Sequence, residues 1–111
     1  MVKSVDEEPY VTLERWGIMQ DIGGYRLVGI ATDTQGGRVS SPVIAFDGHA
    51  RMVETASGRV YHLRGEPDPL VTAAIIRAHI AKWGLRSDEV AIAEVWELDQ
   101  FLRPKPGGWM N

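Results

Sequence analysis

The side chains best suited to bind a metal ion or transfer a proton near neutral pH are three histidines, His49, His62 and His79. We expect them on a turn, in the middle of a strand and on a helix. No two of them have the i, i+4 spacing that places two ligands on one helical face. The chain has no cysteine, which excludes disulfides, a thiol nucleophile and thiolate-bound zinc or iron–sulfur clusters. The sequence therefore predicts no metal site.

Other catalytic motifs are also absent from the sequence. No serine lies in a G-x-S-x-G turn, and the Gly-Gly pairs at 23–24 and 36–37 join expected antiparallel strands rather than forming a phosphate-binding loop. The remaining pair for acid–base chemistry is Glu54 with Tyr61, which would need a concave pocket and a raised carboxylate pKa. Such a pair is more often a cross-strand hydrogen bond. We therefore expect no enzymatic activity and no cofactor.

Charged residues divide the second half of the chain into a basic and an acidic stretch. Residues 38–65 carry four arginines and two carboxylates, whereas residues 87–102 carry five carboxylates and no lysine or arginine. The simplest interpretation is that the two stretches attract each other across the fold. Two functional alternatives compete with it.

In the first alternative, the acidic stretch binds a protein partner. Its carboxylates would attract a basic surface, such as that of a nucleic-acid-handling complex, and its aromatic rings would supply apolar contact area. The residues of this candidate surface are Asp88, Glu89, Glu94, Trp96, Glu97, Asp99 and Phe101. This interpretation ranks first.

In the second alternative, an arginine-bearing face of the sheet binds single-stranded nucleic acid by phosphate contacts and base stacking. The residues of this surface are Arg51, Arg59, His62 and Arg64, and the interpretation requires Arg51, His62 and Arg64 on an open face. The formal net charge of −3 speaks against it, because the chain has no general attraction to phosphate backbones.

The first two thirds of the chain are expected to form the strands that position these side chains. β-Branched and aromatic residues occur there in short runs between glycine-containing turns, which is typical of strands. The expected strands cover residues 11–19, 25–32, 38–46, 50–56 and 59–64. The first two form a hairpin through residues 21–24, and Pro42 favours an edge position or a bulge.

Two-residue hairpin turns at Asp47-Gly48 and Ser57-Gly58 would fix the register of the third to fifth strands. One face would then carry Val43, Ala45, Met52, Glu54, Tyr61 and Leu63. The other face would carry Ile44, Phe46, Arg51, Val53, Val60, His62 and Arg64. Neither face is cleanly polar, so the sheet needs cover on both sides, from a helix with curling of the strands or from a partner.

A helix is expected over residues 68–83, with Asp68 as N-cap, Pro69 at the first helical position and Gly84 after its end. One stripe, Ala73, Ile76, Ile80 and Trp83, is assigned to the sheet. A second stripe comprises Val71, Ile75, Ala78 and Lys82. Either a terminal segment packs on this stripe, or Val71, Ile75 and Ala78 form an interface with a partner or a second copy in a homodimer.

The end of the chain gives a mixed signal. Residues 87–102 fit a strand alternation or a helix; we favour a strand, although Ser87-Asp88-Glu89 resembles a helix start. Residues 104–111 are rich in Pro and Gly and predict a loose tail, whose Trp109 docks on the domain or contacts something else.

Length and composition indicate one α+β domain at residues 10–103, after a flexible segment at 1–9. We expect an antiparallel five-stranded meander with one packed helix and a sixth C-terminal strand or helix. No apolar run is long enough for a membrane helix, and the first nine residues are acidic, so we expect a cytoplasmic protein without membrane contact.

About 30 residues show a familiar pattern. Its parts are Ser41-Pro42 followed by two β-branched residues, then Asp47-Gly48, then Thr55-x-Ser57-Gly58-x-x-Tyr61-x-Leu63, and finally Gly65-x-Pro67-Asp68-Pro69. The pattern resembles a loose group of small uncharacterised bacterial proteins, some carried by phages and mobile elements. The resemblance carries no activity, and its residues are typical of turns, strands and a helix cap. The association with mobile elements leads us to expect a phage or mobile-element inhibitor of a host defence complex, of the anti-CRISPR kind, that acts by occlusion.

Overall fold

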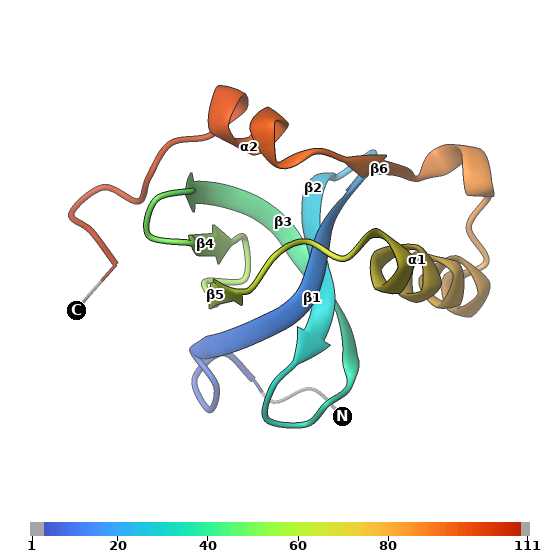
Figure 1. Cartoon of the computed structure of the whole chain (residues 1–111), viewed down its shortest axis with the longest axis horizontal. Helices are drawn as coiled ribbons and strands as arrows, with labels where there is room; N and C mark the ends of the chain where they lie inside the picture. The colour runs from blue at the N-terminus through green and yellow to red at the C-terminus, as the bar shows by residue number, and fades with distance from the viewer. Residues whose placement is uncertain (1–3, 110–111) are drawn as a thin grey trace.

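The computed structural model describes residues 4–109 and shows a mixed α+β fold with one six-stranded sheet and two helices (Figure 1). The sheet is mostly antiparallel, and the class expected from the sequence is confirmed. The elements are β1 (Tyr10–Asp21), β2 (Gly24–Ala31), β3 (Gly37–Asp47), β4 (Met52–Thr55), β5 (Val60–Arg64), α1 (Pro69–Trp83), the 3-10 turn η1 (Ser87–Glu89), β6 (Ala91–Ala93) and α2 (Val95–Phe101).

The expected antiparallel five-stranded meander is wrong in its finer form, because the sheet has six strands and one of its pairs is parallel. The strand order is β2-β3-β4-β5-β1-β6, and β1 also pairs with β2. The closing pair, β1 with β5, is parallel and runs from Tyr10 opposite Val60 to Glu14 opposite Arg64. In a succession of five hairpin-linked strands the first and fifth run in the same direction, so closure between them must be parallel.

A bend in β1 allows this closure. The pairing of β1 with β2 shifts between Glu14 and Gly17, and Arg15 in this bulge has a φ of 49°. Bulges bend a strand and increase its twist. The first half of β1 therefore pairs with β5, and its second half pairs with β6 through Ile18 opposite Ala93.

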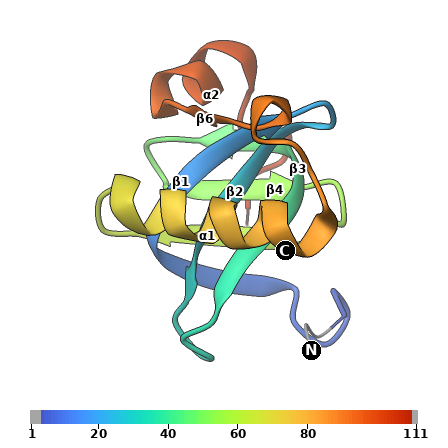
Figure 2. The ribbon, with the colours of Figure 1, turned by 90° about the vertical axis from the view of Figure 1, so that its right-hand side faces the viewer.

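The curled sheet covers its inner face, and α1 covers the outer face of β1 and β2. His62 and Arg64 on the outer side of β5 are exposed, so the expected cover on both faces is wrong for β5. The barrel interior holds one core, which includes Leu13, Tyr61 and Leu63. On the outer face, Met19 and Val28 pack against Ile76 of α1 in a second core. Figure 2 shows α1 lying across the strands. The curled sheet and the helix thus supply the two covers of β1 and β2.

The predicted register is wrong by four residues between β3 and β4 and by one residue between β4 and β5. Residues 48–51 form the first loop, because Asp47 pairs with Met52, and Asp47 Oδ1 accepts hydrogen bonds from the backbone N–H groups of His49 and Ala50, each at 3.0 Å. In the second turn the Thr55 N–H donates to the Arg59 carbonyl. The shift of four keeps β3 and β4 side chains on the predicted faces, whereas the shift of one moves Tyr61 and Leu63 of β5 to the face of Phe46 and Val53, because side chains alternate with a period of two.

As a result, the face that points into the barrel differs from the predicted one. Phe46 pairs with Val53, and Val53 pairs with Tyr61. All three side chains are buried, whereas Glu54 pairs with Val60 and lies on the outside in contact with Lys105.

Helix α1 forms as predicted. The Asp68 carboxylate accepts from the N–H groups of Leu70 and Val71 at 3.1 and 3.0 Å, and Gly84 ends the helix with a φ of 64°. The stripe assigned to the sheet is partly wrong, because Trp83 is 63% exposed and Thr72 is buried instead.

The ambiguous region after α1 contains both kinds of element. Residues 87–89 form η1, residues 91–93 form the short strand β6, and α2 follows. Helix α2 begins with a capping box in which Glu94 and Glu97 bond to each other's backbone N–H. The favoured strand is therefore correct only for residues 91–93, and the helix alternative describes residues 95–101.

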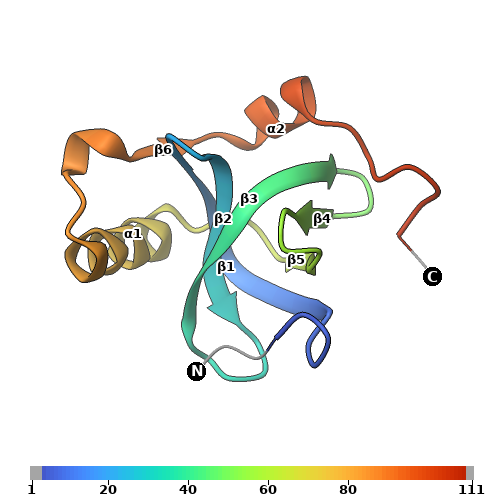
Figure 3. The ribbon, with the colours of Figure 1, turned by 180° about the vertical axis from the view of Figure 1, so that it is seen from behind.

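Hydrogen bonds and an ion pair join the described terminal residues to the barrel, and Figure 3 shows the courses of the two terminal segments from behind. The Phe46 N–H donates to the Arg103 carbonyl at 2.9 Å, and Trp109 Nε1 lies 3.4 Å from Asp47 Oδ2. At the other end of the chain, Glu8 forms an ion pair with Arg38. Trp109 thus docks on the domain. Within residues 4–109, no helix combines the length and the apolar character needed to cross a membrane.

Candidate protein-binding surface

The acidic segment forms an exposed surface at one end of the barrel. We define the β6–α2 ridge as Ile92, Glu94, Trp96, Asp99 and Phe101. Its three large apolar side chains, Ile92, Trp96 and Phe101, are 54%, 60% and 61% exposed. Glu94 and Asp99 are exposed as well. Figure 1 shows α2 at the opposite end of the molecule from the N-terminal segment.

The ridge is held by the side chains that face inward. Ala93 and Leu98 are buried, and Val95 and Leu102 pack against the barrel core. In a helix, residues three and four apart share one face, so Val95, Leu98 and Leu102 turn that face to the barrel and leave Trp96 outside.

Glu97 has a structural role in this surface. The Tyr25 hydroxyl donates to Glu97 Oε1 at 3.2 Å, and Glu97 Oε2 accepts from the Glu94 N–H at 2.8 Å. Burial raises the pKa of the Tyr25 hydroxyl, and the hydrogen bond to the negatively charged Glu97 raises it further. Glu97 therefore fixes α2 on the barrel and is only partly available to a partner.

The other predicted acidic residues differ in their availability. Asp88 and Glu89 lie next to Arg86, whose Nε is 4.0 Å from Glu89 Oε1 and whose guanidinium hydrogen-bonds both oxygens of Asp88. Arg86 offsets part of their charge. Glu94 and Asp99 carry the acidic character of the ridge itself, and Ile92 is an apolar member that the sequence analysis did not single out.

A hollow of about 370 Å³ adjoins the ridge at the mouth of the barrel. Trp16, Phe46, Leu63 and Val95 form its apolar lining, and Asp99 lies at its edge. Apolar hollows of this size accept side chains or small ligands.

The loop of residues 48–51 borders this hollow. The hydrogen bond from the Ala50 N–H is the main cause that lowers the pKa of Asp47. Desolvation raises this pKa, but hydrogen bonds from the Trp109 side chain and the His49 N–H lower it further, so the net shift is downward. Asp47 thus remains ionised and holds the loop by accepting from two of its backbone N–H groups.

The ion pairs of the described residues do not join the acidic stretch to the basic stretch, so the attraction expected between the two is not seen as ion pairs. Arg38 pairs with Glu8 at 2.9 Å, Arg51 with Glu66 at 3.3 Å and Arg64 with Glu14 at 3.6 Å. The arginines are thus engaged by carboxylates outside residues 87–102, which leaves the ridge open.

These pairs also change the predicted nucleic-acid surface. Arg59 is 7% exposed, and its Nε donates to the Glu8 carbonyl at 2.9 Å, so its side chain does not face a ligand. His62 and Arg64 are exposed on β5, but Arg64 and Arg51 each lie beside a carboxylate. The four residues do not form one open basic face.

Glu54 and Tyr61, the remaining candidates for acid–base chemistry, do not lie together in the structure. Tyr61 is buried in the barrel, whereas Glu54 lies outside with its Oε2 3.4 Å from Lys105 Nζ. Groups of three or more potential metal ligands are also absent from the described part of the chain.

The second stripe of α1 lies beside β3. Val71 and Ile75 are half-buried, Ile75 packs against the second core, and Ala78 is exposed. Ile75 and Ala78 line one hollow with Arg38, whose ion-pair partner is Glu8 of the N-terminal segment.

In comparisons with known proteins, no family model, curated protein or solved structure matches this chain.

Proposed function

We propose that this chain is a small protein-binding module that docks on a basic surface of a partner protein through the β6–α2 ridge. The observation that carries the proposal is the exposure of Ile92, Trp96 and Phe101 within one acidic segment. Large exposed rings beside uncompensated carboxylates favour a partner with apolar contact sites surrounded by lysine or arginine.

Three features support a binding rather than a catalytic role. The ridge is fixed on the barrel by Leu98 and by the Tyr25–Glu97 hydrogen bond, so it loses little conformational entropy on binding. The hollow beside Asp99 offers a place for an apolar side chain of the partner. The two carboxylates at the rim, Glu94 and Asp99, would accelerate association by electrostatic attraction.

The resemblance to proteins of mobile elements suggests a specific form of this function. In that form, the ridge covers the nucleic-acid-binding surface of a host defence complex and inhibits it by occlusion. The acidic residues would then occupy the place of phosphates on lysines and arginines of the complex.

The test is affinity purification of the tagged chain from host lysate with nuclease treatment, followed by mass spectrometry and by measurement of the affinity for the purified partner. We expect a stoichiometric protein partner whose affinity falls at least tenfold in Trp96→Ala, because exposed rings at interface centres contribute about 2 kcal/mol. Ile44→Ala is the control, since Ile44 is 54% exposed on β3, outside the ridge.

Two results would contradict the proposal. One is retention of material that disappears with nuclease, which would favour nucleic-acid binding. The other is a partner whose affinity is the same for Trp96→Ala and the wild type, which would place the interface elsewhere on the molecule.

A further inference from the structure

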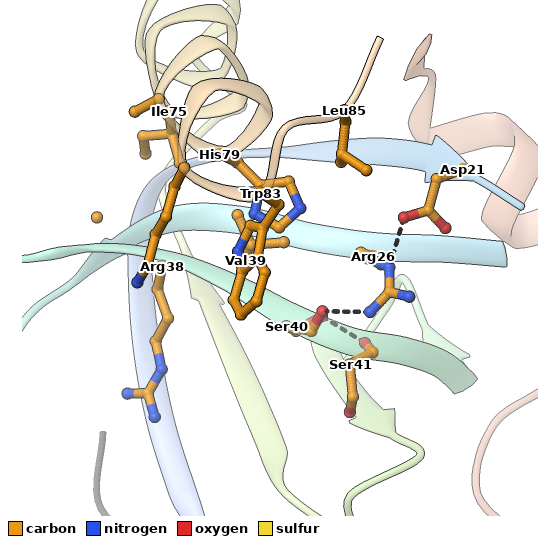
Figure 4. A pocket seen from close by; sticks show the side chains of 13 residues that line it. Asp21, Arg26, Arg38, Val39, Ser40, Ser41, Ile75, His79, Trp83 and Leu85 are labelled. Atoms are coloured by element: carbon orange, nitrogen blue, oxygen red, sulfur yellow. Dashed lines mark hydrogen bonds and ion pairs between the residues drawn. The ribbon is translucent and has the colours of Figure 1, made fainter. Parts of the chain in front are cut away.

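A second hollow lies between α1 and β3, on the outer face of the sheet. We call it the α1–β3 groove; its volume is about 790 Å³, and the lining used here comprises Arg26, Val39, Ile75, Ala78, Lys82 and Trp83. In Figure 4 the side chains of His79 and Trp83 extend from α1 over β3. Ile75, Ala78 and Lys82 are the second stripe of α1, so the stripe forms one wall of the groove.

The groove combines an apolar wall with positive charge. Arg26, Arg38 and Lys82 line it, against the single carboxylate of Asp21. Helix α1 itself contains Arg77 and Lys82 and no acidic residue. The groove is therefore basic on a chain whose net charge is −3.

Arg26 is held in position at one end of the groove. Its Nε donates to Asp21 Oδ2 at 2.8 Å, and one of its terminal nitrogens donates to the Ser40 carbonyl at 3.3 Å (Figure 4). The guanidinium is thus oriented in advance, which lowers the entropic cost of binding an anion.

Lys82 provides a further positive charge in the lining of the groove. Its Nζ lies 5.6 Å from the centroid of the Trp83 ring, and among the described residues it has no ion pair. Arg38, in contrast, is directed to Glu8. Lys82 is therefore the cation that is most available to an incoming carboxylate.

We propose that the α1–β3 groove binds an acidic peptide segment of a partner protein. Aliphatic side chains of the peptide would pack on Ile75, Ala78 and the exposed face of Trp83, and its carboxylates would contact Lys82. Charge complementarity selects an acidic rather than a basic peptide. The aliphatic wall favours a peptide over a single-stranded nucleic acid, which would need several exposed rings for base stacking.

The experiment selects a display library of random 12-residue peptides on the full chain and measures the affinity of the enriched peptides by fluorescence anisotropy. We expect an enriched set that is rich in Asp and Glu with aliphatic residues. Binding should weaken at least tenfold in Lys82→Glu and in Ala78→Glu, both at exposed helix positions, and circular dichroism would confirm that the variants are folded. Arg64→Glu, with the same charge change on β5, and Trp96→Ala on the ridge should bind like the wild type.

Four results would overturn the proposal. They are an enriched set without acidic character, no enrichment at all, binding that persists in Ala78→Glu, or tight binding of a dT20 oligonucleotide that Lys82→Glu abolishes. Sedimentation of the chain alone tests whether a second copy of the chain occupies the groove. A dimer that Lys82→Glu disrupts would show that the occupant is a second copy and not a partner peptide. Because Lys82→Glu and Trp96→Ala alter different surfaces, failure here leaves the ridge proposal standing, and the reverse also holds.

Discussion

Gly17 sets the distance between α1 and the sheet. A Cβ atom built at Gly17 would lie 2.1 Å from Thr72 Oγ1 and 2.6 Å from Thr72 Cγ2. Both residues are buried, so neither neighbour can move into solvent. The helix can approach the strand this closely only because residue 17 has no side chain.

Gly17→Ala is expected to lower the free energy of unfolding by about 2 to 3 kcal/mol, because the added methyl group overpacks the interface. Urea denaturation measures the change. Thr72→Ala in the Gly17→Ala background should recover part of the loss. Gly36→Ala is the control, since its Cβ would meet only Thr34 Oγ1, at 3.4 Å. Equal stabilities of the Gly17 and Gly36 variants would contradict this account.

Single residues show where the sequence was informative about the candidate site. Trp96 and Phe101 were recognised because they lie in the acidic segment that they share with Glu94 and Asp99. Arg26 was not recognised as a groove residue, because it meets α1 only through the packing of the helix on the sheet. Local patterns identify residues that are close in sequence, whereas a groove depends on tertiary contacts.

Most elements were predictable because their boundaries have local chemical signals. Helix α1 follows from Asp68, Pro69 and Gly84, and the first hairpin follows from its glycines. The register of β3 to β5 was not predictable, because the Asp47 side chain stabilises a longer loop than a two-residue turn. The parallel closure of β1 on β5 depends on the bulge at Arg15, for which the sequence has no local signal.

The N-cap of α1 supports a prediction at this scale. Asp68→Ala removes the acceptor for the Leu70 and Val71 N–H groups and should destabilise the fold by about 1 kcal/mol. Thermal and urea denaturation would measure this loss. Asp33→Ala is the control, because the Asp33 side chain accepts only from the adjacent Thr34 N–H. If both variants unfold like the wild type, the cap does not stabilise α1.

The two ends of the barrel are closed in different ways. Residues of the C-terminal part, including Val95 and Leu98, cover one end with apolar side chains. At the other end, Arg38 lies 5.9 Å from the Tyr61 ring centroid and pairs with Glu8, whose carbonyl also accepts from Arg59. The N-terminal segment thus contributes polar contacts to the barrel, a role that its composition did not reveal.

The ion pair of Glu8 with Arg38 should contribute more than the surface pair of Glu66 with Arg51. The side chains of Glu8 and Arg38 are 12% and 10% exposed, whereas that of Glu66 is 85% exposed. Glu8→Gln leaves a nearly buried guanidinium without its counter-charge and should cost about 2 kcal/mol of unfolding free energy. Glu66→Gln should cost at most about 0.5 kcal/mol, because water and salt screen an exposed pair.

Urea denaturation at low and high salt distinguishes the two pairs. The loss in Glu8→Gln should persist at 1 M NaCl, where the Debye length is about 3 Å, because the pair is shielded from solvent ions. A loss of equal size in both variants, or one that high salt removes in Glu8→Gln, would show that the N-terminal segment lies on the barrel without stabilising it. A persistent loss would make this segment part of the folded domain rather than an appendage to it.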